Sequence, residues 1–464
     1  MSVPDSSRLE RLSGMLKRRG IILPAFEIHG GSKGLYDFGP VGGRLRNRVN
    51  QNWIEHWTSM GNITEISCPT VTPYEVLEAS GHVGEFSDFM ADCNSCGEAS
   101  RADTLLEGVH SNPDSLSKSD LQKLFSRHNP ECPSCGARDW SEITAQNLMF
   151  NTVIGAGNSG RQGFLRPETA QGIFVNFLNI QKTGRMKLPF GIAQTGKAFR
   201  NEIVARQFIF RMREFEQMEM QFFIPPGTQK EWYDKWKNNR LKWHLALDMG
   251  KEKYRFHDHE KLAHYADAAT DIEFRFPFGF KELEGIHSRT DFDLSNHEKY
   301  TGKKLQYFDP EQNKNYIPYV VETSIGLDRM FLAVFSNSLS EEIIEGGTSR
   351  IVLKLPPALA PIKVAILPLV KKDGLPELAH KISRNLKWDL TTAYDEKDAV
   401  GRRYRRQDAL GTPYCVTVDH QSLNDKTVTI RERDSMNQER VSIDNLTELI
   451  GKKVSVKSLL EKLV

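Results

Sequence analysis

Hydrophobic residues recur at helical spacing near the start of the chain. Leu45, Val49, Trp53, Ile54 and Trp57 fall on one face of residues 39–60, so a long amphipathic helix is expected before Gly61. Residues 62–71 then alternate between apolar and polar positions, which is typical of a strand. Further strands are predicted within residues 189–203, 210–223 and 316–326. This order of elements predicts an α/β fold.

Two segments interrupt this first pattern, and a third marks its end. Residues from about 88 to 146 hold cysteine pairs and polar loops, whereas residues from about 225 to 269 have a helical pattern rich in Trp, Lys and His. Pro356, Pro357 and Pro361 exclude a regular helix or a central strand. Strands predicted at 363–369 and 413–419 alternate with helical patterns beyond these prolines. We therefore expect one domain over residues 1–355 and a smaller α/β domain over residues 356–464.

The composition is that of an ordinary globular protein, with 39% hydrophobic and 26% charged residues. The chain has no apolar stretch of about 18 residues, so no membrane partner is expected. The amino terminus has no apolar core of the kind that a signal peptide needs, which predicts a cytoplasmic protein. The net charge is only +2, but the chain contains a basic run that is a candidate surface for RNA phosphates. A solvated basic helix face is the alternative for this run, which contains Arg402, Arg403, Arg405 and Arg406.

Four of the six cysteines form two Cys-x-x-Cys pairs, each followed by glycine: Cys93 with Cys96, and Cys132 with Cys135. Two such knuckles complete a tetrahedral sulfur site for Zn²⁺. Four protein ligands leave no open position, so the metal is expected to be structural. A disulfide pairing is the alternative, and a reducing compartment disfavours it. A second cluster, 257-HDHE-260 with His264, is more often a solvated surface of a charged helix than a metal site.

A pair of adjacent strands carries charged and aromatic residues in a second motif, FRNE at residues 199–202 followed by FRMREFEQMEMQFF. Alternation places Arg200 and Glu202 on one strand face, and a return strand brings Arg211, Phe215 and Glu219 over the same surface. Arginine suits phosphate oxygens, an aromatic ring suits a base, and a carboxylate suits an amino group. These residues fit ATP with an ammonium-bearing co-substrate. A cross-strand ladder of salt bridges is the alternative.

A third motif, GLDR at residues 326–329, opens an apolar helix, where Arg329 can reach phosphates. The order of these motifs resembles motifs 1, 2 and 3 of class II aminoacyl-tRNA synthetases. Motif 1 corresponds to Ile63, Ile66 and Pro69 after the long helix, and motifs 2 and 3 correspond to FRNE and GLDR. Longer strings resemble the homodimeric glycyl-tRNA synthetases, among them EIHGGSKGLYDFGPVG, FLRPETAQGIFVNF, ELEGIHSRTDFDLSNH and VVETSIGLDR, and RRQDALGTPYCVTVD resembles their anticodon-binding domain.

This resemblance implies a catalytic domain with a mainly antiparallel sheet flanked by helices, and an anticodon-binding domain with a mixed sheet. It implies that glycine is activated with ATP and Mg²⁺ and is then transferred to tRNA(Gly). Arg200 matches the arginine that holds the α-phosphate, and Arg329 the arginine on the opposite face of the base. Arg200, Glu202 and Arg329 are the expected catalytic residues. The ATP-binding set adds an arginine, the ring stacked on adenine and a carboxylate near magnesium: Arg211, Phe215 and Glu282.

Glycine has no side chain, so the resemblance implies selection through its ammonium and exclusion of anything larger. The matching residues are Glu168, Glu219, Arg289, Glu322 and Ser324. A homodimer is also implied, and we expect motif 1 at its twofold interface because the apolar helix needs a partner surface. The loop at residues 204–207 lacks the Pro and Gly of bacterial relatives. A non-catalytic nucleic-acid-binding paralogue and a class II synthetase for another amino acid are the alternatives.

Overall fold

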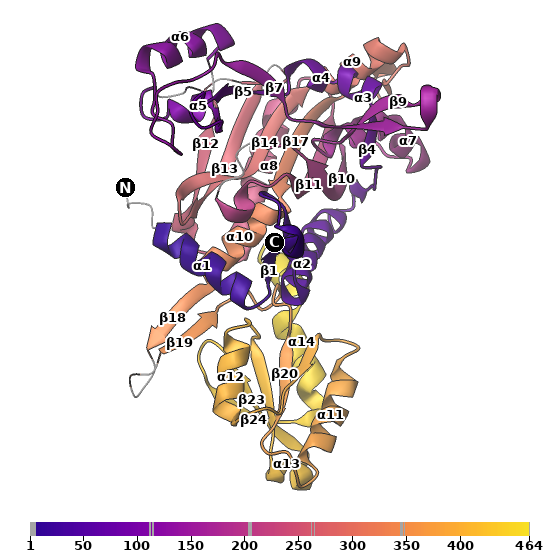
Figure 1. The fold of residues 1–464 in the computed structure, drawn as a ribbon. Helices are drawn as coiled ribbons and strands as arrows, with labels where there is room; N and C mark the ends of the chain where they lie inside the picture. Colours follow the sequence, from indigo (N-terminus) through magenta and orange to yellow (C-terminus); the bar gives the residue numbers. More distant parts are fainter. Residues whose placement is uncertain are drawn as a thin grey trace.

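The computed structural model describes residues 6–463 except 111–112, 114–115, 203–206, 261, 264, 344–346 and 348. Figure 1 shows two stacked bodies, a larger one built on a seven-stranded sheet and a smaller one on a five-stranded sheet. A lobe with α5 (Ala102–Leu105) and α6 (Lys118–His128) projects from the upper left of the larger body. Within the described residues, none of the helices combines the length and apolar character needed to span a membrane.

The seven-stranded sheet has the order β12-β13-β14-β17-β11-β10-β3. All its neighbouring strands are antiparallel except β10 and β3, which confirms the expected mainly antiparallel sheet. Strand β10 ends at Phe199, so Arg200 and Glu202 lie just beyond the strand rather than on it. In sheet order the strands are Tyr254–Asp258, Ala268–Phe276, Gly279–Thr290, Tyr319–Gly326, Glu214–Ile224, Phe190–Phe199 and Ile63–Glu65.

The long helix α2 (Pro40–Thr58) carries the predicted apolar face. Leu45, Val49, Trp53 and Trp57 are all buried within their own chain, in the core that also contains residues of β11 and of α10 (Leu327–Ser338). The reason given for a dimer, that this helix needs a partner surface, is therefore wrong. The sheet of the same chain already covers the helix.

The segment expected to be helical over residues 225–269 is helical only in its first part, α8 (Gln229–Ala246). Residues Tyr254–Asp258 form the edge strand β12, paired with β13. Tyr254 packs against Phe274 of β13 with ring centroids 5.1 Å apart, and this contact favours a strand over a helix. His257 and Asp258 thus end a strand, which corrects the helical expectation for them. His264 lies outside the described residues, as does most of the loop at 204–207.

The remaining elements of the larger body lie around this sheet or in the projecting lobe. Helix α7 (Ala170–Thr183) packs on β10 and β11, and α9 (Phe292–Thr301) packs on α7. The other helices and strands are α1 Ser6–Arg18, β1 Ile22–Pro24, β2 Tyr36–Phe38, β4 Val71–Pro73, α3 Tyr74–Ala79, α4 His82–Glu85, β5 Ser87–Asp92, β6 Ala99–Arg101, β7 Thr144–Asn147, β8 Phe150–Ile154, β9 Arg161–Leu165, β15 Tyr307–Asp309, β16 Lys314–Tyr316, β18 Leu339–Ile343 and β19 Ser349–Leu353.

The smaller body has a mixed sheet of order β21-β20-β22-β23-β24 and its own apolar core. Strand β20 is parallel to β21 and β22, and the other pairs are antiparallel, as expected. Its elements are β20 Val364–Pro368, α11 Leu375–Leu386, β21 Thr392–Tyr394, α12 Val400–Asp408, β22 Tyr414–Val418, α13 His420–Asp425, β23 Thr427–Glu432, β24 Gln438–Ser442, α14 Leu446–Val454 and α15 Lys457–Leu460.

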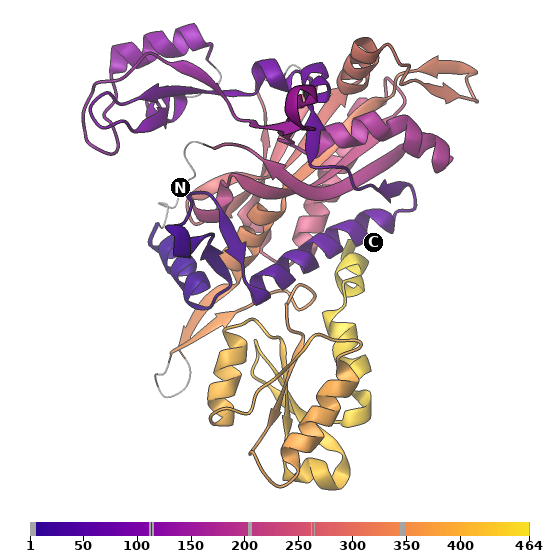
Figure 2. The same cartoon turned by 45° about the vertical axis from the view of Figure 1, so that its right-hand side comes forward.

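The end of the chain returns to the larger body, as Figure 2 shows beside α2. Lys462 Nζ lies 2.6 Å from Asp248 Oδ2, just after α8. A second link joins Arg48 of α2 to Thr391, with Nη2 donating to Oγ1 at 3.0 Å. The smaller body therefore contacts the larger one through the end of the chain and through the residue just before β21.

Candidate active site

A pocket of about 110 Å³ opens at the junction of β11, β17 and α10. Separate segments bring their side chains to it: the end of β10, the turn before β11, β14, and the first turn of α10. Its lining contains all six residues expected to bind ATP: Arg200, Glu202, Arg211, Phe215, Glu282 and Arg329.

Arg200 is fixed although it lies beyond strand β10. Its backbone N–H donates to the carbonyl of Arg213 at 3.0 Å, which extends the β10–β11 pairing past the end of the strand. Its Nε donates to the carbonyl of Pro167 at 3.2 Å. The guanidinium lies 5.4 Å from the ring centroid of Phe215, within the range of a cation–π contact. A cation and an aromatic face thus lie side by side in the pocket.

Arg329 and Glu282 face each other across the same pocket. Arg329 Nη1 lies 2.9 Å from Glu282 Oε2, and its guanidinium lies 4.4 Å from the ring centroid of Phe210. The positive charge of Arg329 holds the pKa of Glu282 below its usual range. Glu282 is therefore an ionised carboxylate, half-exposed at the pocket mouth, and it can face a cation.

Glu202 is one of two buried acids that line this pocket, and the other is Asp328. The Glu202 side chain lies 3.9 Å from Arg211, measured from Oε2 to Nε. Burial raises the pKa of Glu202, and the charge of Arg211 offsets part of this rise. The backbone carbonyl of Glu202 accepts from Arg213 Nε at 3.0 Å, so the turn that carries the acid is tied to the start of β11.

Deeper in the sheet, two rows of cross-strand neighbours form a second part of the site. Gln221, Glu322 and His287 lie directly opposite one another on β11, β17 and β14. Two residues along, Glu219, Ser324 and Gly285 make the next row. Residues opposite one another in an antiparallel sheet share a face, and so do residues two apart on one strand. Both rows therefore point to the same side, and Ser324 also lines the pocket of about 110 Å³.

Glu322 is held by three donors. Its Oε2 accepts from Gln221 Nε2 at 2.6 Å and from Arg289 Nη1 at 3.1 Å, and its Oε1 accepts from His287 Nδ1 at 2.8 Å. Burial would raise the pKa of Glu322, but the charge of Arg289 and the bond from His287 hold it far below its usual range. Glu322 is thus a buried carboxylate that stays ionised.

Glu219 lies beside Glu322, but its pKa is shifted in the opposite direction. It is 2% exposed, and it accepts from the Thr169 hydroxyl and from Gln221 Nε2, the latter at 3.2 Å. Burial, together with the negative charges of Glu322 and Glu168, raises the pKa of Glu219 well above its usual value. Two adjacent carboxylates, one of them short of positive partners, form a site that favours a small cation.

Arg289 and Glu168 close the outer side of this second part. Arg289 makes a two-bond contact with Asp293, with Nε to Oδ2 at 2.8 Å and Nη2 to Oδ1 at 3.0 Å. Glu168 Oε1 accepts from Gln171 Nε2 at 3.0 Å and lies 3.4 Å from His82 Nε2. Burial opposes ionisation of Glu168, but His82 and Arg289 lower its pKa to about 2. All five residues expected at a glycine site therefore meet in one network.

The same network contains polar residues that the sequence analysis did not single out. Gln217 and Gln221 flank Glu219 on β11, and their period-2 spacing was a visible signal that they share its face. The others, which come from elements far apart in the sequence, gave no such signal: Thr169, Gln171, His287 and Asp293.

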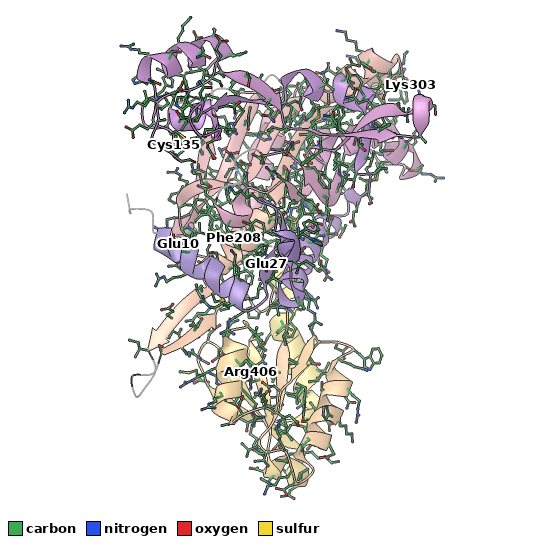
Figure 3. All side chains as sticks on the ribbon, in the orientation of Figure 1. Glu10, Glu27, Cys135, Phe208, Lys303 and Arg406 are labelled. Carbon is green, nitrogen blue, oxygen red and sulfur yellow. The ribbon has the colours of Figure 1, made fainter. Side chains whose placement is uncertain are left out.

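The four cysteines of the projecting lobe also come together. Their sulfur atoms all lie within 4.8 Å of one another. Cys93 Sγ is 3.7 Å from Cys135 Sγ, and the same distance separates Cys96 from Cys132. A disulfide needs about 2.05 Å, so these cysteines are unbridged thiols. Figure 3 shows Cys135 on the projecting lobe.

Helix α12 corrects one expectation about the basic run. Arg403 is 2% exposed, and its guanidinium donates to the carbonyls of Pro368 at 2.6 Å and Leu369 at 3.1 Å. Its predicted contact with RNA is therefore wrong, because helical spacing turns it inward together with Gln407. Arg402 and Arg405 are exposed. Arg406, labelled in Figure 3, pairs with two aspartates, one of them Asp395 at 2.9 Å.

Comparison with known proteins defines the class first. Residues 154–338 match the family model "tRNA synthetase class II core domain (G, H, P, S and T)", and residues 363–453 match the model "Anticodon binding domain". A solved prolyl-tRNA synthetase from Cryptosporidium parvum has the same fold, with a TM-score of 0.62 and 14% identity over 100% of this chain and 78% of that one. The RNA binding domain of threonyl-tRNA synthetase from Cryptosporidium parvum Iowa II also matches, with a TM-score of 0.65 and 17% identity over 96% of this chain and 98% of that one. The chain therefore has the fold of a class II aminoacyl-tRNA synthetase, a class that uses ATP and Mg²⁺.

Closer relatives define the family. The chain is 45% identical to the glycine–tRNA ligase of Chlorobaculum tepidum, over 96% of this chain and 100% of that protein. It is 46% identical to the glycine–tRNA ligase of Acetivibrio thermocellus, over 94% of this chain and 96% of that protein. The chain belongs to the glycine–tRNA ligase family.

Proposed function

We infer that this chain activates glycine with ATP to form glycyl-adenylate and diphosphate, and then transfers glycine to the 3′ end of tRNA(Gly). One observation carries this inference beyond the relatives' names: Glu219 and Glu322, two buried carboxylates, share a sheet face with Ser324, which also lines the nucleotide pocket. An ammonium group held by these acids lies next to a bound nucleotide.

Activation requires positioning and charge neutralisation, because a glycine carboxylate oxygen attacks the α-phosphorus of ATP while the bond to the β-phosphate oxygen breaks. We assign Arg200 to the α-phosphate and the glycine carboxylate, and Arg211 and Arg329 to the remaining phosphates and the base. Phe215 stacks on adenine, and Glu202 accepts from the adenine amino group. Glu282 is an ionised carboxylate beside these arginines, which suits Mg²⁺. Bound Mg²⁺ would neutralise charge on the phosphates.

Glycine selection rests on a filled, charged pocket. Glu219 and Glu322 accept the ammonium N–H groups, and Ser324 lies between them and the nucleotide. Arg289 keeps Glu322 ionised and in place, and Glu168 adds negative charge behind the pair. We attribute the exclusion of alanine to a steric clash between its Cβ and the groups packed around the ammonium site. Binding of the ammonium would also relieve the repulsion that raises the pKa of Glu219.

We place the domain boundary between residues 355 and 356, with catalysis in the first domain and anticodon recognition in the second. The separate core of the second body and the family model over residues 363–453 support this division. The exposed Arg402 and Arg405 are the candidates for contacts with tRNA phosphates, whereas Arg403 is excluded by its burial. Arg406 takes part only if it leaves its aspartates.

The cysteine cluster is proposed as a structural Zn²⁺ site. Four thiols within 4.8 Å, without a disulfide, fit a tetrahedral sulfur site. Free thiols also agree with a reducing compartment, which supports a cytoplasmic protein. Metal analysis of protein purified without chelator is expected to give one zinc per chain, and Cys96→Ser should lower that ratio without abolishing glycine-dependent exchange. Protein that is fully reduced and zinc-free would contradict this site.

A homodimer is supported by an apolar surface away from α2. Val71 of β4 and Val175 of α7 are 43% and 40% exposed. They line a recess of about 120 Å³ together with Cys68 and Pro69 of motif 1. A second copy of the chain that covers this recess would bury these side chains. Sedimentation at micromolar concentration is expected to show a dimer, and a monomer alone would contradict the proposal.

The activity is tested by ATP–diphosphate exchange with each of the twenty amino acids in turn. Glycine alone should support exchange. Exchange with threonine, proline or histidine would identify a different class II synthetase. Binding of tRNA without exchange for any amino acid would favour the non-catalytic paralogue.

A further inference from the structure

We infer that His287 is a positioning residue for glycine recognition: it fixes the orientation of the Glu322 carboxylate that receives the substrate ammonium. This inference rests on the proposed function, and it assigns a role to a side chain outside the set of residues expected from the sequence. Three observations support it: the hydrogen-bond geometry of Glu322, the space that Gly285 leaves, and the charges behind the imidazole ring.

The geometry of Glu322 is fixed from both sides of its strand. Gln221 on β11 and His287 on β14 lie directly opposite Glu322 in the sheet. Gln221 Nε2 donates to Oε2 at 2.6 Å, and His287 Nδ1 donates to Oε1 at 2.8 Å. Each carboxylate oxygen thus has a donor from a different neighbouring strand. Rotation of the carboxylate would break at least one of these bonds.

The two oxygens of Glu322 differ in how many of these donors contact them. Oε2 also accepts from Arg289 Nη1 at 3.1 Å, so it keeps a charged partner if Gln221 is lost. Of the three donors Gln221, Arg289 and His287, only His287 contacts Oε1. Loss of the imidazole therefore frees one end of the carboxylate. The freed group can turn toward Arg289 and away from an incoming ammonium.

The ring of His287 fits because its neighbour has no side chain. A Cβ on Gly285 would come within 2.9 Å of His287 Cε1 and 3.4 Å of its Nε2. Contacts below about 3 Å between a Cβ and a ring atom require one of them to move. Gly285 thus opens the space in which the ring lies, in the row next to Glu219 and Ser324.

Charges behind the ring favour a donor at this position. His287 faces Glu322 on β17 and Asp271 on β13, and Asp271 pairs with His259 at 2.9 Å. Arg289 on the same strand opposes protonation, and burial does so as well, but the bond to Glu322 and the two carboxylates raise the pKa of His287. The rings of His259 and Tyr265 also lie near the imidazole, with centroids 6.1 Å and 6.3 Å away, and Glu282 is a further acid close enough to interact with its charge. The ring is therefore held between two acids, and Nδ1–H is directed at Glu322.

The experiment compares His287→Ala with His287→Asn, which keeps an N–H donor near the same place. Exchange kinetics would give kcat and separate KM values for glycine and ATP. We expect His287→Ala to raise the glycine KM about tenfold, the loss typical of a hydrogen bond to a charged group, with the ATP KM within about twofold. His287→Asn should restore most of the glycine affinity. His128→Ala, at the exposed end of α6, is the matched control and should behave as wild type.

A second measurement tests whether His287 acts through Glu322. In a Glu322→Gln background, adding His287→Ala should change the glycine KM by less than about twofold, because coupled residues are not additive. Thermal unfolding of each variant separates loss of folding from loss of binding. If His287→Ala does not fold, His287→Leu, which fills the volume without donating, replaces it.

An unchanged glycine KM in a folded His287→Ala variant would overturn the inference, and so would an equal loss of ATP affinity. A further tenfold rise in the glycine KM when His287→Ala is added to Glu322→Gln would also overturn it. If the wild-type protein itself shows no glycine-dependent exchange, it is the proposed function that fails, whatever the variants do.

Discussion

The proposed glycine part and the proposed nucleotide part of the site lie on the same sheet, but their charged side chains differ in burial. In the glycine part, the side chains of Arg289 and Glu322 are each 5% exposed and make several hydrogen bonds. In the nucleotide part, the paired side chains of Arg329 and Glu282 are 24% and 49% exposed. The first part is a buried network with fixed geometry, and the second is an open set of arginines next to solvent.

This difference follows from what each part recognises. A small ammonium has few contacts to offer, so its partners must be desolvated and oriented before it binds. A triphosphate brings many charges of its own, and exposed arginines can rearrange around it at low cost. On the proposed assignment, glycine is therefore recognised by a network that is already formed, whereas ATP binding involves movement of exposed side chains.

The largest expected effect breaks the buried network. Arg289→Met leaves Asp293 and Glu322 buried without their cation, which should cost about 3–5 kcal/mol of unfolding free energy. Arg329→Met, at the open pair, should cost less than about 1 kcal/mol. Urea unfolding of both variants checks the comparison. Equal losses would show that the two parts do not differ in the way described.

A change of one buried acid should affect glycine and leave ATP alone. Glu322→Gln removes one charge from the ammonium site, and a charge-assisted bond there is worth about 1.5–3 kcal/mol, so the glycine KM should rise roughly 10- to 150-fold. The ATP KM should change little, and alanine should still be refused because its exclusion is steric. Exchange assays with glycine, alanine and ATP give all three quantities. A parallel loss of ATP affinity would place the amino-acid site elsewhere.

The reciprocal change in the open part should be smaller. Phe215→Leu removes a stacking surface worth about 0.5–1.5 kcal/mol, which corresponds to a rise in the ATP KM of roughly 2- to 13-fold. Glycine affinity should stay within about twofold. Direct titration of ATP into both proteins is the check. If glycine binding weakens as much as ATP binding, the two parts are coupled.

The smallest expected effect is the release of a fraction of a proton when glycine binds. Burial and two neighbouring acids raise the pKa of Glu219, so the empty site favours its protonated form. A substrate ammonium favours the carboxylate, so binding lowers this pKa and releases a fraction of a proton. Glycine affinity should therefore increase as pH rises toward the raised pKa of Glu219. Calorimetry of glycine binding in buffers of different ionisation enthalpy measures the release, and Glu219→Gln should abolish it.

Part of this arrangement was predictable from the sequence because it depends on local pattern. The strand that carries Glu219 alternates polar and apolar residues, and the spacing of the cysteines already indicates two knuckles that can meet. Alternation predicts which face of a strand a residue occupies, and the Cys-x-x-Cys spacing predicts a tight turn. Both features depend on local sequence, so they could be predicted without knowledge of the packing.

Other features depend on which elements pack together, and the sequence does not carry that information. Four arginines in α12 look equivalent as a run, yet Arg403 is buried against the carbonyls of Pro368 and Leu369. The apolar face of α2 appeared to need a partner chain, but its own sheet covers it. His287 lies in the string ELEGIHSRTDFDLSNH, whose family resemblance does not single out this residue, and only the register of β14 against β17 places it opposite Glu322.

The most direct test of the difference between the two parts is a crystal structure with a non-hydrolysable glycyl-adenylate analogue. The analogue's ammonium should lie within hydrogen-bond distance of Glu219 and Glu322, with the Glu322–Arg289 contact kept near its present 3.1 Å. Arg329 should leave Glu282, now 2.9 Å away, to contact the adenylate. A broken Glu322–Arg289 contact, or an ammonium bound away from both acids, would contradict a pre-formed glycine site.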